Sequence, residues 1–145
     1  MAKTRANWAS AHVLWAETEC HSTPPAVYPI DWRLTRLPKA LASFEAVRAI
    51  HGTPLQITSF YRTPAYNAAI GGAVNSQHCQ GTAWDAEPPD GVRPTQFYEE
   101  VVALAQARPD LQIGFVAGYP VSKSKPRGQI HVDNGPAREH KWIST

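Results

Sequence analysis

Three residues of the chain carry side chains that bind metal ions, at a spacing that could form one site. His78 lies seven residues before Asp85, with Gly81 and small residues between them, and His131 follows in the late segment Gln-Ile-His-Val-Asp. Imidazole nitrogens and carboxylate oxygens are ligands that zinc accepts, and a catalytic zinc ion usually has three protein ligands and one position open for water. His78, Asp85 and His131 are therefore candidate zinc ligands. The alternative is a surface histidine and an unrelated aspartate that share a loop.

Asp133 is a candidate general base. Residues 129–133 have the character of a strand, so His131 and Asp133 should point the same way while Val132 faces the core. A carboxylate beside a metal-activated water molecule could take its proton and pass it to a leaving amine, which is the chemistry of amide hydrolysis. In this role, Asp133→Ala should abolish hydrolysis while zinc stays bound. The alternative role is a salt-bridged carboxylate next to a metal ligand.

Arg62 follows the strand-like segment 54–60 and is the candidate cation of the site. A cation close to the metal could hold the substrate or stabilise the charge that develops on the carbonyl oxygen; the alternative is an ordinary structural ion pair. A protein nucleophile is not indicated, because Ser59 and Ser76 lack the sequence of a nucleophile elbow and Cys79 has no clear base partner. The candidate substrate-binding residues are Tyr61, Ser76, Gln77 and Tyr119.

Apolar residues recur at helical spacing in the segments expected to form the main helices. Residues 35–51 and 94–107 each carry such a stripe, and each is predicted to be an α-helix. A shorter helix is predicted over Pro64–Ile70, because Thr63 and Pro64 are the residue types of an N-cap and a first helical position.

The N-terminal part is predicted to wrap around this core. An apolar stripe over residues 5–18 predicts a helix, and the proline-rich residues 19–32 predict a loop. The predicted strands are residues 54–60, 82–86, 112–116 and 129–133. This order predicts an α+β fold with a small antiparallel sheet packed against helices. Residues 1–145 should form one domain, in which residues 1–34 are the N-terminal helix and wrapping loop.

Composition excludes several classes of protein. The chain has 145 residues, 43% hydrophobic and 18% charged, which is typical of one globular domain. The formal charge of +2 and scattered basic residues do not favour nucleic-acid binding. The densest basic group, Lys123, Lys125 and Arg127, is interpreted as a solvated loop, with contact to an anionic polymer such as cell wall as the alternative.

Membrane insertion is not expected, because no apolar run approaches spanning length. The N-terminus lacks the apolar region of a signal peptide, which leaves the localisation open. Cys20 and Cys79 could pair in an oxidising compartment or remain buried thiols. We expect a monomer.

Several spaced motifs together resemble a known family. They are Ile57 to Pro64, Asn67, Gly71 to Ala73, Ser76 to His78, Gly81, Ala83 and Asp85. In this order they are similar to the zinc D-Ala-D-Ala carboxypeptidases, which include vancomycin-resistance D,D-dipeptidases and phage L-alanyl-D-glutamate endopeptidases. The late block Ile130 to Pro136, with Arg138 and Trp142, is similar to a bacterial periplasmic branch of that family. The likeness covers roughly residues 35 to 142.

The resemblance implies a hedgehog/D,D-peptidase-like α+β fold, with one zinc ion on His78, Asp85 and His131. It also implies that Arg62 assists the transition state and that the substrate is a peptidoglycan stem peptide. The chain would then be a D,D-carboxypeptidase or an endopeptidase, such as a phage or prophage endolysin. One position departs from the family: well-studied branches place the catalytic carboxylate three residues before the third ligand, where this chain has Gly128. A non-catalytic zinc-containing wall or virion module is therefore the alternative.

Overall fold

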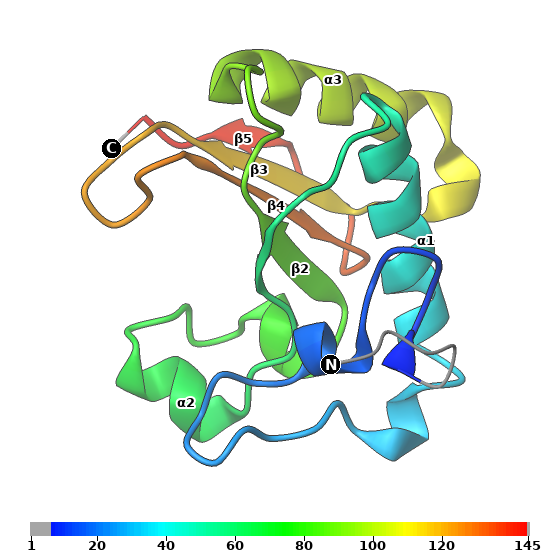
Figure 1. Cartoon of the computed structure of the whole chain (residues 1–145), viewed down its shortest axis with the longest axis vertical. Helices are drawn as coiled ribbons and strands as arrows, with labels where there is room; N and C mark the ends of the chain where they lie inside the picture. The colour runs from blue at the N-terminus through cyan, green and yellow to red at the C-terminus, as the bar shows by residue number, and fades with distance from the viewer. Residues whose placement is uncertain (1–6, 145) are drawn as a thin grey trace.

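The computed structural model describes residues 7–144 and has the α+β architecture that the sequence predicts. Over these residues, five strands form one sheet in the order β1-β2-β4-β3-β5, with α-helices packed around it (Figure 1). The strands are β1 (Ile57–Ser59), β2 (Ala83–Ala86), β3 (Phe115–Tyr119), β4 (Gln129–Asp133) and β5 (Lys141–Trp142). The helices are α1 (Leu37–Ala49), α2 (Pro64–Ala69) and α3 (Pro94–Ala107). None of the helices within residues 7–144 has the length and apolar character needed to cross a membrane.

The three predicted α-helices are confirmed, because each begins and ends where local chemistry requires. Thr63 caps α2: its side-chain oxygen accepts a hydrogen bond from Tyr66 N at 3.1 Å. Beyond α1 the chain turns at Gly52, whose φ of 67° lies in the left-handed region that glycine adopts without strain. α3 has proline in its first turn, where a missing N–H costs no hydrogen bond.

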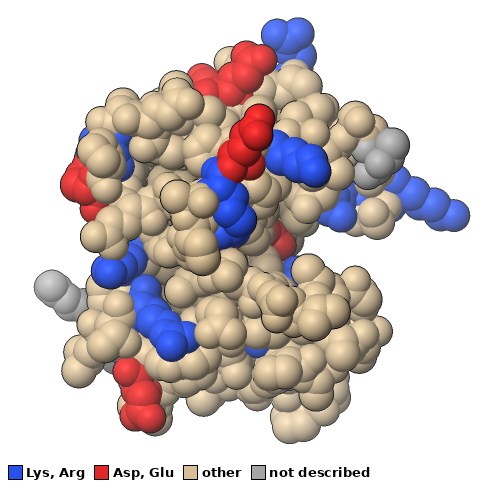
Figure 2. Space-filling model, turned by 180° about the vertical axis from the view of Figure 1, so that it is seen from behind, with Lys and Arg blue, Asp and Glu red and all other residues tan. Residues whose placement is uncertain are grey.

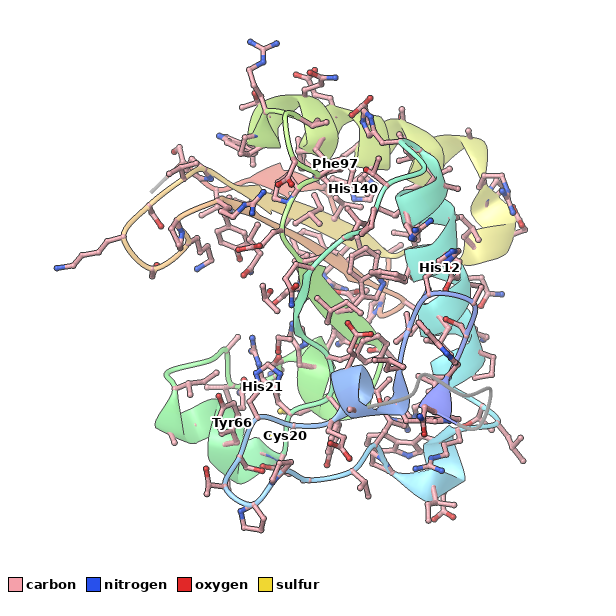
Figure 3. The ribbon with its side chains drawn as sticks, viewed as in Figure 1. His12, Cys20, His21, Tyr66, Phe97 and His140 are labelled. Carbon is pink, nitrogen blue, oxygen red and sulfur yellow. The ribbon has the colours of Figure 1, made fainter. Side chains whose placement is uncertain are left out.

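The hydrophobic core lies between the sheet and the two long helices. Trp84 on β2 is fully buried and packs edge-on against Phe44 of α1, with ring centroids 5.0 Å apart. Its indole N–H donates to Ser43 Oγ at 2.9 Å, so the polar atom of this large side chain is satisfied inside the core. Phe97 lies between α3 and the sheet (Figure 3) and is also fully buried. This packing fixes the sheet strands β2 and β4, which carry the candidate ligands Asp85 and His131.

The predicted N-terminal helix is wrong over the described residues 7–18. Trp8 and Leu14 instead form an antiparallel bridge, and a single 3-10 turn follows at Trp15–Thr18. The apolar spacing arises because side chains such as Val13 enter the core singly, and not because one helix face does so. The predicted loop over residues 19–32 is present, with a short 3-10 turn at Ile30–Trp32.

The position of β3 differs from the predicted strand at residues 112–116. Gln112 has a φ of 54° and ends a 3-10 turn, so an extended strand cannot begin there. Gly118, which lies beyond the predicted strand, is part of β3, and a Cβ there would lie 2.7 Å from the Trp142 ring. Trp142 thus docks closely on the sheet as part of β5, which pairs with β3 in parallel while the other pairs are antiparallel.

Glu45 on α1 forms hydrogen bonds with the N-terminal segment. We expect its replacement to cause a pH-dependent loss of stability. It accepts hydrogen bonds from Ser10 Oγ at 2.6 Å and from His12 N and Nδ1 at 2.9 and 2.6 Å. Burial raises the pKa of Glu45, but the bonds from Ser10 and His12 outweigh it and lower that pKa. A depressed folded-state pKa stabilises the protein above the unfolded value, and this contribution disappears as the pH falls through the folded value.

We therefore expect Glu45→Gln to lower the free energy of unfolding by about 1 kcal/mol at pH 7. At a pH well below the lowered folded-state pKa of Glu45, the variant and the parent protein should have equal stability, because Glu45 is then protonated in both the folded and the unfolded state. Urea denaturation at the two pH values measures this difference. Glu99→Gln, at an exposed position of α3, is the control and should change little at either pH. A Glu45→Gln deficit that stays constant with pH would contradict an ionic role.

Candidate metal centre

The sheet register brings two of the candidate ligands together. Asp85 on β2 and His131 on β4 are directly opposed in the antiparallel pair. Directly opposed residues on one face of such a pair have Cβ atoms about 4.5–5.5 Å apart. On the other side of β2, Asp85 pairs with Ser59 of β1, the strand that leads to Arg62. Three segments far apart in the sequence therefore meet at Asp85.

His78 comes from the short 3-10 helix η4 (Gln77–Gln80), which precedes β2. Ser76 caps this helix, because its Oγ accepts a hydrogen bond from His78 N at 3.2 Å. Gly81 ends it with a φ of 71°, and a Cβ at that position would lie 2.7 Å from the Tyr28 hydroxyl. The chain needs glycine here both for its backbone conformation and for the close approach of Tyr28. This tight turn places His78 beside the start of β2.

The structure brings His78, Asp85 and His131 together, with one potential ligand atom from each lying within 4.8 Å of the others. Asp85 Oδ1 is 2.9 Å from His131 Nδ1, and Asp85 Oδ2 is 3.1 Å from His78 Nε2. His78 and Asp85 are almost completely buried. Two imidazoles and a carboxylate form the nitrogen and oxygen donor set of a zinc site with an open position.

An unpartnered atom supports the fit of this cluster to a metal ion. His78 Nδ1 lies 2.6 Å from the carbonyl oxygen of Phe60, which accepts hydrogen bonds, so Nδ1 carries the proton in the neutral ring. Nε2 then presents a lone pair toward the Asp85 carboxylate, and it is buried without a hydrogen-bond partner. Two facing acceptors 3.1 Å apart repel each other unless a proton or a metal cation lies between them. The donor set therefore fits a metal cation.

The electrostatics of the cluster favour a positive charge. Burial raises the pKa of Asp85, but the positive charge that His78 has in its protonated form and the hydrogen bond from His131 overcome this effect and hold that pKa far below its usual range. Burial lowers the pKa of His131, whereas hydrogen bonds to Asp133 and Asp85 raise it to about 9. In the protein without metal, a proton on His131 thus supplies part of the positive charge that a bound cation would provide.

Arg62 lies at the edge of the cluster and is held on three sides. Its Nε donates to Ser59 Oγ at 3.0 Å, and its Nη1 donates to Asn67 Oδ1 at 3.2 Å. Its Nη2 lies 3.4 Å from Asp85 Oδ2, and the side chain is 16% exposed. A fixed, partly exposed guanidinium next to the cluster can form an ion pair with Asp85 and also present N–H groups to a substrate. Both roles expected from the sequence remain open.

Asp133 lies on the other side of the His131 ring. Its Oδ2 is 2.7 Å from His131 Nε2, and Val132 between the two residues is fully buried, which confirms the predicted alternation. Arg138 Nη2 also donates to Oδ2 at 2.7 Å, and Gly135 N donates to Oδ1 at 3.0 Å. Both carboxylate oxygens therefore accept hydrogen bonds from neighbouring residues. This geometry favours the salt-bridged role of Asp133 over that of a free base.

Gly128, where well-studied branches of the resembled family carry an acid, is closely packed. Its φ is 75°, in the left-handed region that side-chain-bearing residues rarely adopt. A Cβ there would lie 2.7 Å from Pro94 Cγ and 2.9 Å from the Tyr119 carbonyl oxygen. Backbone geometry and packing both require glycine at this position. The absence of an acidic residue here therefore follows from the local fold.

A hollow of about 390 Å³ opens beside the cluster. His131, Asp133 and Arg138 line it together with three of the residues predicted to bind substrate: Ser76, Gln77 and Tyr119. Figure 2 shows a notch in the right-hand edge of the molecule, with acidic and basic atoms at its inner end. Burial and the charge of Asp85 raise the pKa of Tyr119 against the opposing charge of Arg62. Its volume lies within the range of about 300–1,000 Å³ that is typical of ligand pockets.

Tyr61, the fourth residue predicted to bind substrate, is not among the residues that line this hollow. It packs edge-on against Tyr28 and Trp32, with ring centroids 5.9 and 6.1 Å apart, in an aromatic cluster behind the site. Cys20 and Cys79 are both free thiols, and Figure 3 shows Cys20 at the end of the molecule that carries α2. The contact between Arg138 and Asp133 is not predicted from the sequence, because it crosses the irregular segment after β4.

The comparisons with known proteins decide the family. The chain matches the model of the peptidase M15 family over residues 11–116, more than half of its length. The chain belongs to this family. Peptidases of the M15 family are metallopeptidases that act on peptidoglycan-type substrates. The matched segment includes His78 and Asp85 but ends before His131. A search of curated proteins gives no match.

Proposed function

We propose that this M15 peptidase hydrolyses a peptide bond in peptidoglycan stem peptides with one zinc ion bound by His78, Asp85 and His131. The observation that carries the proposal is the buried lone pair of His78 Nε2, which faces Asp85 at the point where His131 also converges. A bound zinc ion would polarise the scissile carbonyl and lower the pKa of a water molecule. The reaction is either a D,D-carboxypeptidase or an endopeptidase cleavage at the cell wall, such as that of an endolysin.

The protein's own residues would orient the substrate. Gln77 and Tyr119 line the hollow beside His131, where they can donate hydrogen bonds to a peptide backbone. Arg62, held by Ser59 and Asn67, can direct its N–H groups at the oxygen on which negative charge develops. Preorganised donors need not rearrange during the reaction, which is why such contacts lower the barrier. Tyr61 would act indirectly, through the packing of the aromatic cluster behind Arg62.

Digestion of purified peptidoglycan tests the proposal. The protein loaded with zinc should release muropeptide or amino-acid fragments that mass spectrometry identifies, and a chelator should stop the release. Zinc added back in stoichiometric amount should restore it. The fragment masses distinguish the two reactions, because a D,D-carboxypeptidase releases single D-alanine residues and an endopeptidase releases larger pieces. If protein with one zinc per chain releases nothing, the catalytic proposal fails.

A non-catalytic zinc module is the second candidate. Gly128 occupies the position of the acid in well-studied branches, and both oxygens of Asp133 are engaged by neighbouring donors. A chain without a free general base could keep the metal and bind the wall without turnover. Sedimentation with insoluble peptidoglycan separates the candidates: binding without fragment release favours the module.

A further inference from the structure

We propose that Arg138 is a positioning residue that orients the candidate ligand His131 through Asp133. This role rests on the proposed metal site and belongs to a residue outside the candidate ligand set. Consecutive contacts lead from Arg138, at the exposed rim of the hollow, through Asp133 to the cluster. The His131 ring at the inner end faces Asp85 with Nδ1 and Asp133 with Nε2, at 2.9 and 2.7 Å.

Asp133 is built to hold the His131 ring in one orientation. Its side chain is fully buried and receives hydrogen bonds from His131 Nε2, Arg138 Nη2 and Gly135 N. Three donors on two oxygens fix the plane of the carboxylate. A histidine ligand that donates its second ring N–H to a carboxylate has its ring orientation fixed, which is the usual support of a metal-bound imidazole. Asp133 therefore directs Nδ1 of His131 toward Asp85 and the cluster.

Arg138 is itself held by several contacts, although its side chain is partly exposed. Its guanidinium lies over the Phe115 ring, 4.6 Å from the centroid, and its Nη1 donates to the Pro136 carbonyl oxygen. Its backbone N–H donates to Gly114 O at 2.9 Å. The Phe115 ring also lies 5.8 Å from the His131 ring, so the same residue contacts both ends of this series of contacts. A flexible surface arginine would not have these restraints.

The ion pair matters because the Asp133 carboxylate is buried. Without Arg138, this charge would lose its cationic partner in a poorly solvated position, where an unpaired charge is strongly unfavourable. The carboxylate would then rotate or recruit water, and the His131 ring would lose its fixed orientation. Outer partners of metal ligands typically contribute about 10–100-fold to metal affinity. The expected result of removing Arg138 is therefore a weaker metal site in a protein that still folds.

The test measures zinc affinity by competition with a chromophoric chelator, together with the melting temperature of the metal-free protein. Arg138→Gln should weaken zinc binding by about 10-fold or more, and Arg138→Lys should recover part of the loss because it restores the charge. Arg108→Gln is the matched control: Arg108 also forms a short ion pair with an aspartate, Asp110, but on the exposed surface. It should leave zinc affinity unchanged.

Each outcome bears on a different claim. If the parent protein fails to bind one zinc ion, the proposed metal site fails and Arg138 has no ligand to position. If the parent binds zinc and Arg138→Gln binds it equally tightly, the positioning role is overturned, even if the variant melts earlier. Should Arg138→Gln not fold, Asp133→Asn provides the same test. Retained zinc affinity with lost hydrolysis in Asp133→Asn would favour the general base instead.

Discussion

Asp85→Asn is expected to abolish stoichiometric zinc binding while the protein keeps its fold. Asp85 is the residue on which the cluster converges: its two oxygens face His131 and His78, and Arg62 lies 3.4 Å from one of them. Asparagine has nearly the same shape, but its amide is neutral and a poor zinc ligand. The loss of affinity should exceed the roughly 100-fold effect of removing an outer partner of a ligand.

Thermal and chemical denaturation with and without zinc measure this effect. A ligand that binds only the folded protein stabilises it by about 2.7 kcal/mol at a free concentration 100 times its dissociation constant. The parent protein should gain this increment, and Asp85→Asn should gain none under the same conditions. Because the increment compares each protein with itself, it is independent of any change that the substitution causes in the metal-free protein.

Asp110→Asn is the control for the general effect of removing a carboxylate that lies outside the cluster. Asp110 forms a short ion pair with Arg108, but its side chain is 62% exposed and lies outside the cluster. Its replacement should leave the zinc increment intact. If Asp85→Asn still binds zinc with the parent's affinity, the metal site is not at this cluster, and the proposed function loses its main support.

Much of the fold could be predicted because the decisive signals are local. The stripes of α1 and α3, the Thr63 cap and the glycine after α1 each act within a few residues, and β4 occupies the predicted residues 129–133. The same local signals failed over residues 7–18. There, apolar residues at helical spacing are buried one by one against a core formed by later segments.

The three candidate ligands could be proposed from their residue types, but their convergence depends on the sheet. Asp85 and His131 meet because β2 and β4 pair in one register, and a slip of one residue would put the side chains on opposite faces. The partners of Asp133 were not predictable in this way. Arg138 reaches it across the irregular segment after β4, and no periodicity describes such a segment.

Gly128→Ala is expected to be strongly destabilising, because it combines backbone strain with a steric clash. An alanine in the left-handed region costs about 1–2 kcal/mol, and forcing a methyl group into a closely packed position typically adds about 1–3 kcal/mol. Here the new Cβ would lie 2.7 Å from Pro94 Cγ and 2.9 Å from a backbone oxygen of Tyr119. The backbone oxygen cannot move aside as the end of a flexible side chain could.

Gly91→Ala separates the two contributions. Gly91 has a φ of 79°, close to the 75° of Gly128, but a Cβ there would meet nothing within 4 Å. Its replacement should therefore cost about 1–2 kcal/mol, from backbone conformation alone. Urea denaturation of both variants gives the difference, which isolates the contact with Pro94 and Tyr119. Equal losses would show that these neighbours yield at little cost.

Gly128→Glu would restore the acid of the well-studied branches, but it should not create a working base. It has the backbone strain and the Cβ clash of the alanine variant, so it should lose at least as much stability and gain no hydrolytic activity. Its backbone would have to shift relative to Pro94, in the first turn of α3, and to Tyr119 at the end of β3. If this chain hydrolyses peptidoglycan, its proton acceptor therefore lies elsewhere. A stable Gly128→Glu variant with higher activity would reverse this argument, because it would mean that the position still has room for the acid.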